Sequence, residues 1–434
     1  MTVRVGAPKN HQHCLFSAAV VIPLVTALAT CVATSASWAQ SSAPAQSSAP
    51  VSMSLSTASR LHSPGWWPTK GDAARDSFVG TATCAKCHAA KVASQQKHAM
   101  ARAAVPAADA GILRQHDHLS FRLGPYREQI VTKAGMSLLT VTANDSKPPL
   151  STNLLWAFGA GHLGQTYVYE KNGGYYESHL SFFSSTQDLN ITPGQSLATP
   201  RTREEAAGRR MPPAETRACF ACHTTASVTN NQLDLNNAVP GVTCEACHGP
   251  GASHVIAMNS GQPEPGAQLI MNPSRLDPVA SVDFCGACHR TWQDVVTNIG
   301  LGALNLRFAP YRLENSKCWS KPDARLTCVA CHDPHQPLEH DPAAYDSKCL
   351  QCHLNQPGTK TAADLKDLNH PDSDHPDSDH RDTVHPDLVH PDLDHPGVAC
   401  PVSTKTCTTC HMPKIESSLQ HSTFTDHWIS KPAK

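Results

Sequence analysis

The first hydrophobic feature of the chain is an apolar run from Cys14 to Val32 that contains no charged residue. Basic Arg4 and Lys9 precede the run, and small residues ending in Ser37-Trp38-Ala39 follow it. This order is typical of a secretory signal peptide, so we expect cleavage near residue 39 and a periplasmic or otherwise extracytoplasmic protein. A retained membrane anchor is the alternative, because the run is almost long enough to span a bilayer. Pro23 in the middle of the run favours cleavage, and no second apolar run follows, so the mature chain is expected to have no membrane span.

Residues 119–183 show a different pattern, in which short apolar segments alternate with turn residues. Segments 129–131, 137–141 and 166–169 predict strands, because β-branched and aromatic residues dominate them. Lys171-Asn172-Gly173-Gly174 predicts a hairpin turn, since Asn and Gly adopt positive φ at little cost. We therefore expect a small antiparallel β subdomain around 119–183.

A third pattern is a five-residue repeat, mostly His-Pro-Asp, within residues 370–396. Its period fits neither a helix nor a strand, and its prolines remove backbone donors from both. We expect an exposed, extended spacer with no packed core. Loose binding of zinc or copper is the alternative, because histidine recurs throughout the repeat. The repeated histidines are His370, His375, His380, His385, His390 and His395.

Composition shows where the chemistry lies. The 434 residues include 35 basic and 36 acidic side chains, a balance that gives no field to steer the chain toward nucleic acid. The 18 cysteines and 26 histidines are the unusual feature. A chain of this length can bury an ordinary core, so it does not need cysteines as staples for a tiny fold. The cysteines require another explanation.

Seven copies of Cys-x-x-Cys-His use 14 of the 18 cysteines. This spacing is the attachment signature of c-type haem, because two thiols one helical turn apart reach both vinyl groups of one porphyrin. The next residue then places an imidazole under the iron. The copies, numbered here as motifs 1 to 7, are Cys84/Cys87/His88, Cys219/Cys222/His223, Cys244/Cys247/His248, Cys285/Cys288/His289, Cys328/Cys331/His332, Cys349/Cys352/His353 and Cys407/Cys410/His411.

Zinc ribbons and disulfides are the competing interpretations of paired cysteines. Neither requires a histidine directly after every second cysteine, and all seven motifs have one. The sequence therefore predicts seven covalently bound c-type haems, with the motif cysteines as attachment points and the motif histidines as iron ligands. Of the remaining cysteines, Cys14 and Cys31 are expected to leave with the signal peptide. Cys318 and Cys400 stay unassigned.

Several stretches of the chain resemble the multihaem cytochromes of the c-552/c-554 type and their relatives with doubled Cys-x-x-Cys-His motifs. The resemblance covers most of residues 78–429 except the repeat, and it implies closely spaced haems with two histidine ligands each, in a mostly helical and loop-rich protein. The stretches are FVGTATCAKCHAAKVASQQKHAMARA (78–103), GVTCEACHGPGASH (241–254), CVACHDPH (328–335), YDSKC (345–349), and the ending from Cys407 to Ile429 with CHMPK and HSTFTDHWI.

A low-spin haem needs a second axial ligand, so seven further ligands are required. The resemblance favours five histidines for this role, and His98 lies ten residues after His88 on a helix predicted over 89–104. Methionines 100, 211, 258 and 271 are expected to pack as apolar side chains instead. The five favoured residues are His98, His254, His335, His421 and His427, and those that compete for the remaining positions are His118, His162, His179 and His340.

The fold class expected from these patterns is mainly α and irregular, built around a haem core, with the small β subdomain attached. The expected segments are a signal peptide (1–39), a low-complexity tether (40–77), a first haem segment (78–118), the β subdomain (119–183), a multihaem region with five haems (184–369), the His-Pro-Asp insert (370–396) and a terminal haem segment (397–434).

Electron transfer is the favoured function, because seven haems in so short a chain must share a core. Other redox proteins or quinol-linked donors are the expected partners. The alternative is a multihaem oxidoreductase that acts on a nitrogen or sulfur oxyanion at one open haem. Multihaem nitrite reductases typically mark their catalytic haem with a lysine in place of the motif histidine, and no such motif occurs here. A metal-binding surface protein built around the repeat is a third, weaker hypothesis.

Overall fold

The computed structural model describes residues 73–297, 305, 307–316, 319, 326–353 and 403–432. The chain divides into two units, residues 1–48 and 49–434, and every described residue belongs to the second. The predicted signal peptide, the tether up to residue 72, the His-Pro-Asp insert, Cys318 and Cys400 lie outside the described residues.

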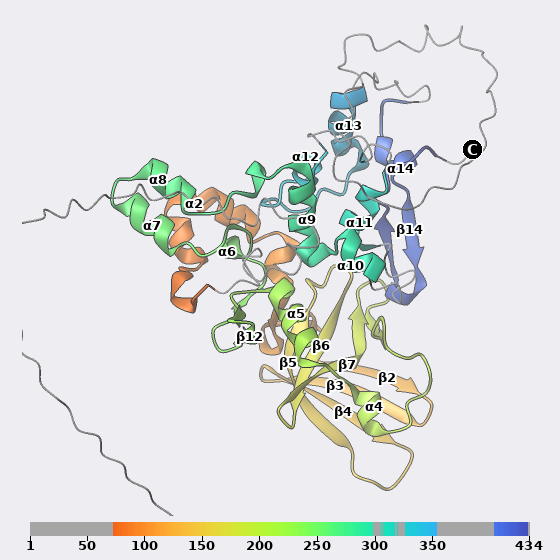
Figure 1. Cartoon of the computed structure of the whole chain (residues 1–434). Coiled ribbons are helices and arrows are strands. Elements are labelled where there is room, and N and C mark those ends of the chain that lie inside the picture. The colour runs from red at the N-terminus through yellow and green to blue at the C-terminus, as the bar shows by residue number, and fades with distance from the viewer. Residues whose placement is uncertain are drawn as a thin grey trace, which may run out of the picture. The chain divides into compact units, whose positions relative to one another are not determined.

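A large antiparallel sheet occupies the chain between residues 104 and 210 (Figure 1). Its strand order is β2-β3-β4-β5-β6-β7-β8, with β1 paired to β5 and β9 paired to β7. Strands β2 and β8, at the two ends of this order, also contact each other, so the sheet curls until its ends meet. The strands are β1 (Ala104–Pro106), β2 (His118–Leu123), β3 (Tyr126–Lys133), β4 (Met136–Ala143), β5 (Leu150–Phe158), β6 (Gly164–Lys171), β7 (Gly174–Phe183), β8 (Asp188–Ile191) and β9 (Gly208–Arg210).

The sheet has an apolar core of its own. Ile130, Leu139, Tyr167 and Leu180 are fully buried in it, and burial of such a side chain contributes about 1.5–3 kcal/mol. Two short helices, α3 (Gly111–Gln115) and α4 (Arg203–Ala207), complete this part, and α4 packs its alanines into the same core. The hairpin predicted at 171–174 is present between β6 and β7, where Asn172 and Gly173 both have positive φ.

The expected fold class, mainly α and irregular around a haem core with a small β subdomain, is wrong. The sheet has nine strands and begins and ends well outside 119–183. Burial of polar side chains along β7 hid any alternation there: Ser178, His179 and Ser181 are all buried. They are tolerated because they have partners, such as Ser181 Oγ with Thr192 Oγ1 at 2.8 Å.

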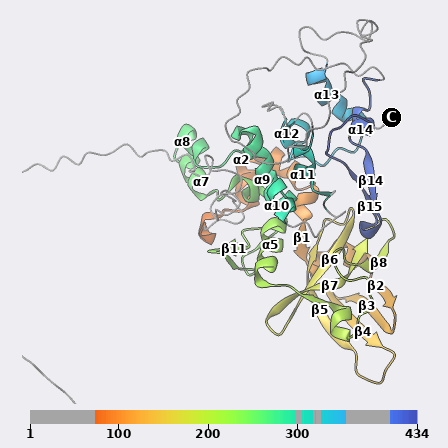
Figure 2. The same cartoon turned by 45° about the vertical axis from the view of Figure 1, so that its right-hand side comes forward.

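The rest of the described chain is built from short helices joined by loops, with three small two-stranded ladders. In Figure 1 and in the turned view of Figure 2, α9, α11 and α12 lie together, in agreement with their packing contacts. The helices are α2 (Thr81–Gln95), α5 (Pro213–His223), α6 (Cys244–His248), α7 (Ala252–Asn259), α8 (Pro263–Gln268), α9 (Pro278–His289), α10 (Trp292–Thr297), α11 (Ala309–Glu314), α12 (Cys328–Cys331), α13 (Asp346–His353) and α14 (Cys407–His411). The ladders pair β10 (Thr224–Thr225) with β13 (Val239–Pro240), β11 (Val228–Thr229) with β12 (Gln232–Leu233), and β14 (Lys414–Ser417) with β15 (Ser422–Thr425).

The helix predicted over 89–104 starts earlier and ends earlier, since α2 runs from Thr81 to Gln95. A 3-10 turn (Ala99–Arg102) follows it, and the His98 side chain accepts a hydrogen bond from the backbone N–H of Met100 at its start. Among the described helices, none is long and apolar enough to cross a bilayer.

Candidate haem sites

Each of the seven motifs lies on a helix that stops or breaks at its histidine. Helices α5, α6, α9, α13 and α14 end at the motif histidine itself. Helix α12 ends at Cys331, so that His332 is its C-cap, and α2 is interrupted at His88, whose φ and ψ are −113° and 37°. The helical turn puts the two thiols of a motif on one side, and the break turns the imidazole away from the helix axis.

The two cysteines of a motif differ in exposure. All seven first cysteines are half-buried. Four of the second cysteines are exposed instead. These four are Cys87 of motif 1, Cys288 of motif 4, Cys331 of motif 5 and Cys410 of motif 7. The side chain of Cys352, the second cysteine of motif 6, lies outside the described residues.

All four cysteines lie beside the end or the break of their helix, although Cys222 and Cys247 have the same position on α5 and α6 and are half-buried. Cys87 directly precedes the break of α2 at His88, and Cys331 is the last residue of α12. Cys288 and Cys410 come one residue before the ends of α9 and α14. No regular turn of the same helix follows directly to cover such a side chain. Because cysteine is ordinarily among the most buried residue types, thiols exposed at the same motif position are accessible to a group outside the polypeptide.

The first cysteines of different motifs lie in contact. Cys84 of motif 1 and Cys244 of motif 3 share a side-chain hydrogen bond, which raises the pKa of Cys84 and lowers the pKa of Cys244 to about 6. Cys285 of motif 4 and Cys328 of motif 5 share another, which raises the pKa of Cys285 and lowers that of Cys328. The motifs therefore meet in pairs, 1 with 3 and 4 with 5, although several of them are distant in sequence.

Two carboxylates connect motif helices by accepting hydrogen bonds from backbone N–H groups. Glu245, between the two cysteines of motif 3, is buried and accepts hydrogen bonds from the backbone N–H groups of Val79 and Gly80, both at 2.8 Å, at the start of α2. Its Oε1 also accepts from the N–H of Gly251 at 2.9 Å. In this way the motif 3 segment caps the helix that carries motif 1.

Asp346, at the start of α13, caps the helix of motif 7 in the same way. Its two oxygens accept from the N–H groups of Thr406, at 2.7 Å, and Cys407, at 2.9 Å, where α14 begins. These two bonds lower the pKa of Asp346. Sequence reasoning did not single out Glu245 or Asp346, because a cap supplied by a residue far along the chain leaves no local signal.

Further contacts connect the pairs of motifs into one series. The Sγ of Cys222 in motif 2 lies 3.6 Å from the carbonyl oxygen of Ala287 in motif 4. The charge of Cys247 in motif 3 raises the pKa of Cys285 in motif 4, after larger effects of Cys328 and burial. The Tyr345 ring, next to motif 6, lies edge-on to the His332 ring of motif 5 at 5.5 Å. Each of the seven attachment sites therefore lies beside at least one other attachment site.

Two motif histidines face a second imidazole. The ring centroids of His248 and His335 lie 5.9 Å apart with planes only 15° from parallel. Those of His332 and His427 lie 6.2 Å apart at 42°. Two metal–nitrogen bonds of about 2 Å, with about 1.1 Å from each nitrogen to its ring centre, would separate two imidazoles on one iron by about 6 Å. The centroid separations of both pairs match this distance.

The second ring nitrogens of several histidines are held by backbone carbonyls. Among the motif histidines, Nδ1 of His223 donates to Ala103 at 3.1 Å, and Nδ1 of His248 and His411 donate to Met271 and Ser430, each at 2.8 Å. A hydrogen on Nδ1 leaves the Nε2 lone pair free for a metal, and metal-binding histidines are usually fixed in this way. His254 and His427 have the same arrangement, with Gly266 and Thr425 as acceptors.

Burial favours the neutral, ligating form of these rings. It is the largest cause that lowers the pKa of His223, His248, His289, His332 and His427. The donor set, thiol pairs with a neutral imidazole beside each, is the one that covalent haem requires. The residues present therefore fit the group.

The other three favoured ligands have different surroundings. His98 lies near motifs 4 and 5, because its charge lowers the pKa values of His289 and His332. Its Nδ1 accepts from Met100 N–H, however, so the hydrogen of the neutral ring is on Nε2. His254 is held on α7 by its bond to α8, with no motif histidine among its described ring contacts.

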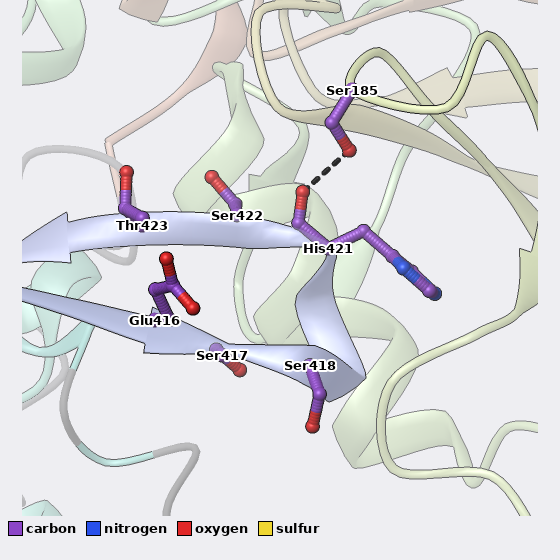
Figure 3. A pocket seen from close by; sticks show the side chains of 7 residues that line it. All are labelled: Ser185, Glu416, Ser417, Ser418, His421, Ser422 and Thr423. Carbon is purple, nitrogen blue, oxygen red and sulfur yellow. Dashed lines mark hydrogen bonds between the residues drawn. The ribbon is translucent and has the colours of Figure 1, made fainter.

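His421 lies at the tip of the hairpin β14–β15, in the left-handed conformation (φ 47°). Its ring packs edge-on against Phe183 of the sheet at 4.7 Å, and the Ser185 hydroxyl donates to its carbonyl oxygen (Figure 3). An open groove of about 610 Å³ surrounds it, lined by Ser185, Glu416, Ser417, Ser418, His421, Ser422 and Thr423. The described contacts of His421 are with the sheet.

The four competing histidines are also engaged elsewhere or exposed. Three of them bond within or beside the sheet: His118 with Gln129 at 2.9 Å, His162 with Arg102 at 3.2 Å, and His179 with Glu128 at 3.2 Å. His340 lies exposed in a loop. Their described contacts include no motif histidine.

A family model described as cytochrome c554 and c-prime matches residues 178–249, which contain motifs 2 and 3. This segment of the chain is similar to that family of c-type cytochromes. No curated protein matches the chain. Among solved structures, the crystal structure of the outer cell wall cytochrome OcwA is similar at 16% identity with a TM-score of 0.27, over 49% of this chain and 37% of that one. The chain thus spans well under two thirds of the length of this structural relative.

Proposed function

We propose that this cytochrome is an exported heptahaem protein that passes electrons between redox partners. The seven motifs support the haem number, because each has a complete attachment sequence on a helix that breaks at the histidine. The leader-like N-terminus supports export. Other redox proteins or quinol-linked donors are the proposed partners.

Each bound haem would supply reversible one-electron chemistry at its iron. The protein's own residues prepare for this in three ways. Motif cysteines provide the thioether attachment, and the carbonyl-bonded histidines hold a lone pair at a fixed orientation. His335 and His427, whose rings lie 5.9 and 6.2 Å from those of His248 and His332, would supply the second iron ligands there.

The observation that carries the proposal is the unbroken series of neighbouring attachment sites. A protein that moves electrons over a distance needs its carriers close together, whereas an enzyme with one active haem needs an open coordination position. The paired thiols of motifs 1 and 3 and of motifs 4 and 5 would set their haems at close range. His335 and His427 would fill the second coordination positions at motifs 3 and 5.

The experiment is to purify the mature protein and count its haems by pyridine haemochrome, then to record EPR spectra of the oxidised form. We expect seven haems per chain, all low-spin, and no binding of carbon monoxide after reduction. A count of two or three haems would defeat the heptahaem assignment. A high-spin haem that binds carbon monoxide and turns over nitrite or hydroxylamine would make the protein an oxidoreductase instead.

A further inference from the structure

Two arginines converge on one aromatic side chain beside the motif helices. The guanidinium carbon of Arg307 lies 5.0 Å from the centroid of the Phe308 ring, and that of Arg290 lies 5.8 Å from the same centroid. Phe308 is buried and directly precedes α11. Two positive charges therefore share a small region, and both arginine residues are exposed to solvent.

Neither guanidinium pairs with a carboxylate among the residues that the structure describes, and their described contacts are with the ring and with each other's charge. Several other described arginines have a carboxylate partner. Those with carboxylate partners include Arg203 with Asp145, Arg209 with Glu177 and Glu215, and Arg312 with Asp426. Both arginines are exposed and their like charges repel each other, so an anionic group from outside the polypeptide would be favoured near the two guanidinium groups.

The pair lies between motifs 2 and 4. Arg290 directly follows His289, and the charge of Arg307 lowers the pKa of His223. The two motif helices, α5 and α9, pack on each other, with Cys222 against Ala287. An anion held by both arginines would therefore lie close to two haem sites.

The backbone of Arg290 is held in an unusual conformation that suits this placement. Its φ is 66° and its ψ is 118°, a region that residues other than glycine rarely adopt. The next residue, Thr291, is clamped to Asp294 by reciprocal hydrogen bonds at 3.1 Å, which start α10 and fix the sharp turn. Strained residues of this kind persist where the surrounding structure requires them, often at binding sites.

We propose that Arg290 and Arg307 bind one anionic oxygen group, a carboxylate or a small oxyanion, beside the haem sites of His223 and His289. The planar guanidinium matches this class of ligand, because its N–H groups donate in parallel to two oxygens. Two sources fit the same chemistry: a propionate of a haem attached at motif 2 or 4, or a free oxyanion from solution. The inference rests on haem attachment at these two motifs, which the haem count tests separately.

The test uses the full holoprotein with Arg307→Gln and, separately, Arg290→Gln, each checked for its full haem count before a redox titration. Loss of one positive charge should disfavour the reduced, more negative haem. We expect the equilibrium constant for reduction of one haem to fall about tenfold, a potential lower by about 59 mV for one electron. Arg307→Lys keeps the positive charge but loses the parallel N–H donors of the guanidinium. Its reduction potential should therefore shift less than that of Arg307→Gln. Arg201→Gln, which removes an exposed arginine paired with Glu205 of α4, is the matched control.

Titration of the wild type with sodium sulfate and with sodium nitrite at constant ionic strength distinguishes the sources. A potential that ignores both salts, with both Gln variants shifted, indicates a haem propionate. A potential that falls as the salt is added, and a response that Arg307→Gln abolishes, indicates a free oxyanion. The proposal is overturned if both Gln variants, at full haem count, titrate like the wild type and Arg201→Gln with and without the salts.

Discussion

The carboxylate of Glu245 accepts the backbone N–H of Gly80 at 2.8 Å, across 165 positions of sequence. One residue of motif 3 thereby caps the helix of motif 1, and the same carboxylate also holds Val79 and Gly251. The two attachment sites with touching cysteines are fixed to each other by this one buried side chain.

Glu245→Gln should therefore destabilise the packing of α2 against α6. The amide keeps one acceptor oxygen but turns a donor toward backbone N–H groups, and leaving a buried donor unpaired costs about 1–3 kcal/mol. We expect a lower unfolding midpoint in guanidinium chloride and a smaller number of attached haems. Glu170→Gln, at an exposed position of β6, is the control. An unchanged midpoint in Glu245→Gln would show that the three bonds contribute nothing.

His335→Ala should convert the haem at His248 from low-spin to high-spin. The two rings face each other at 5.9 Å, so loss of one ring frees an axial position. One haem in the protein should gain a high-spin EPR signal and bind carbon monoxide when reduced. His340→Ala, which removes an exposed histidine, should leave both measurements as in the wild type. A His335→Ala protein that stays entirely low-spin would contradict the pairing.

Arg312 should position His427 through the neighbouring aspartate. Its guanidinium donates twice to Asp426, at 2.7 and 2.6 Å, and lies 4.8 Å from the Trp428 ring centroid. Arg312→Gln should therefore give part of the high-spin EPR signal that His427→Ala gives in full. The double variant should show the same signal as His427→Ala alone. Additive effects in the double variant would mean that Arg312 acts elsewhere.

The stability of the sheet should fall as the pH rises. Burial raises the pKa of Glu128. Burial alone lowers the pKa of His179, but the hydrogen bond and charge of Glu128 and the carbonyl of Ser196 together outweigh it, so the pKa of His179 is raised. Both folded pKa values lie above the ordinary values of 4.5 and 6.5, so the folded sheet holds protons that the unfolded chain has released. The contribution of this pair to stability is therefore highest below pH 4.5. It declines above pH 4.5 as Glu128 loses its proton in the unfolded chain, and again above pH 6.5 as His179 does. Each proton accounts for at most about 1.4 kcal/mol for each pH unit.

Hydrogen exchange of the β3 and β7 amides, followed by mass spectrometry from pH 4 to 8 after correction for intrinsic rates, measures this decline. The double variant Glu128→Gln/His179→Gln should lose the pH dependence. A wild-type sheet whose corrected protection rises with pH would contradict the assigned direction.

The sequence alone determined the haem attachment motifs, because covalent attachment depends on five consecutive residues and needs no distant partner. It also determined the hairpin at 171–174, since Asn172 and Gly173 suit positive φ wherever they occur. The extent of the sheet was not readable, because buried Ser178, His179 and Ser181 look like surface residues until their partners are known.

Only the tertiary structure decided which imidazole faces which. His335 and His427 were favoured as ligands by resemblance, but their opposition to His248 and His332 depends on how distant helices pack. The caps from Glu245 and Asp346, and the meeting of Arg290 with Arg307 at Phe308, have the same origin. Such contacts join residues with no fixed spacing along the chain, so local sequence patterns carry no record of them, whereas a motif closed within one helical turn is complete in the sequence itself.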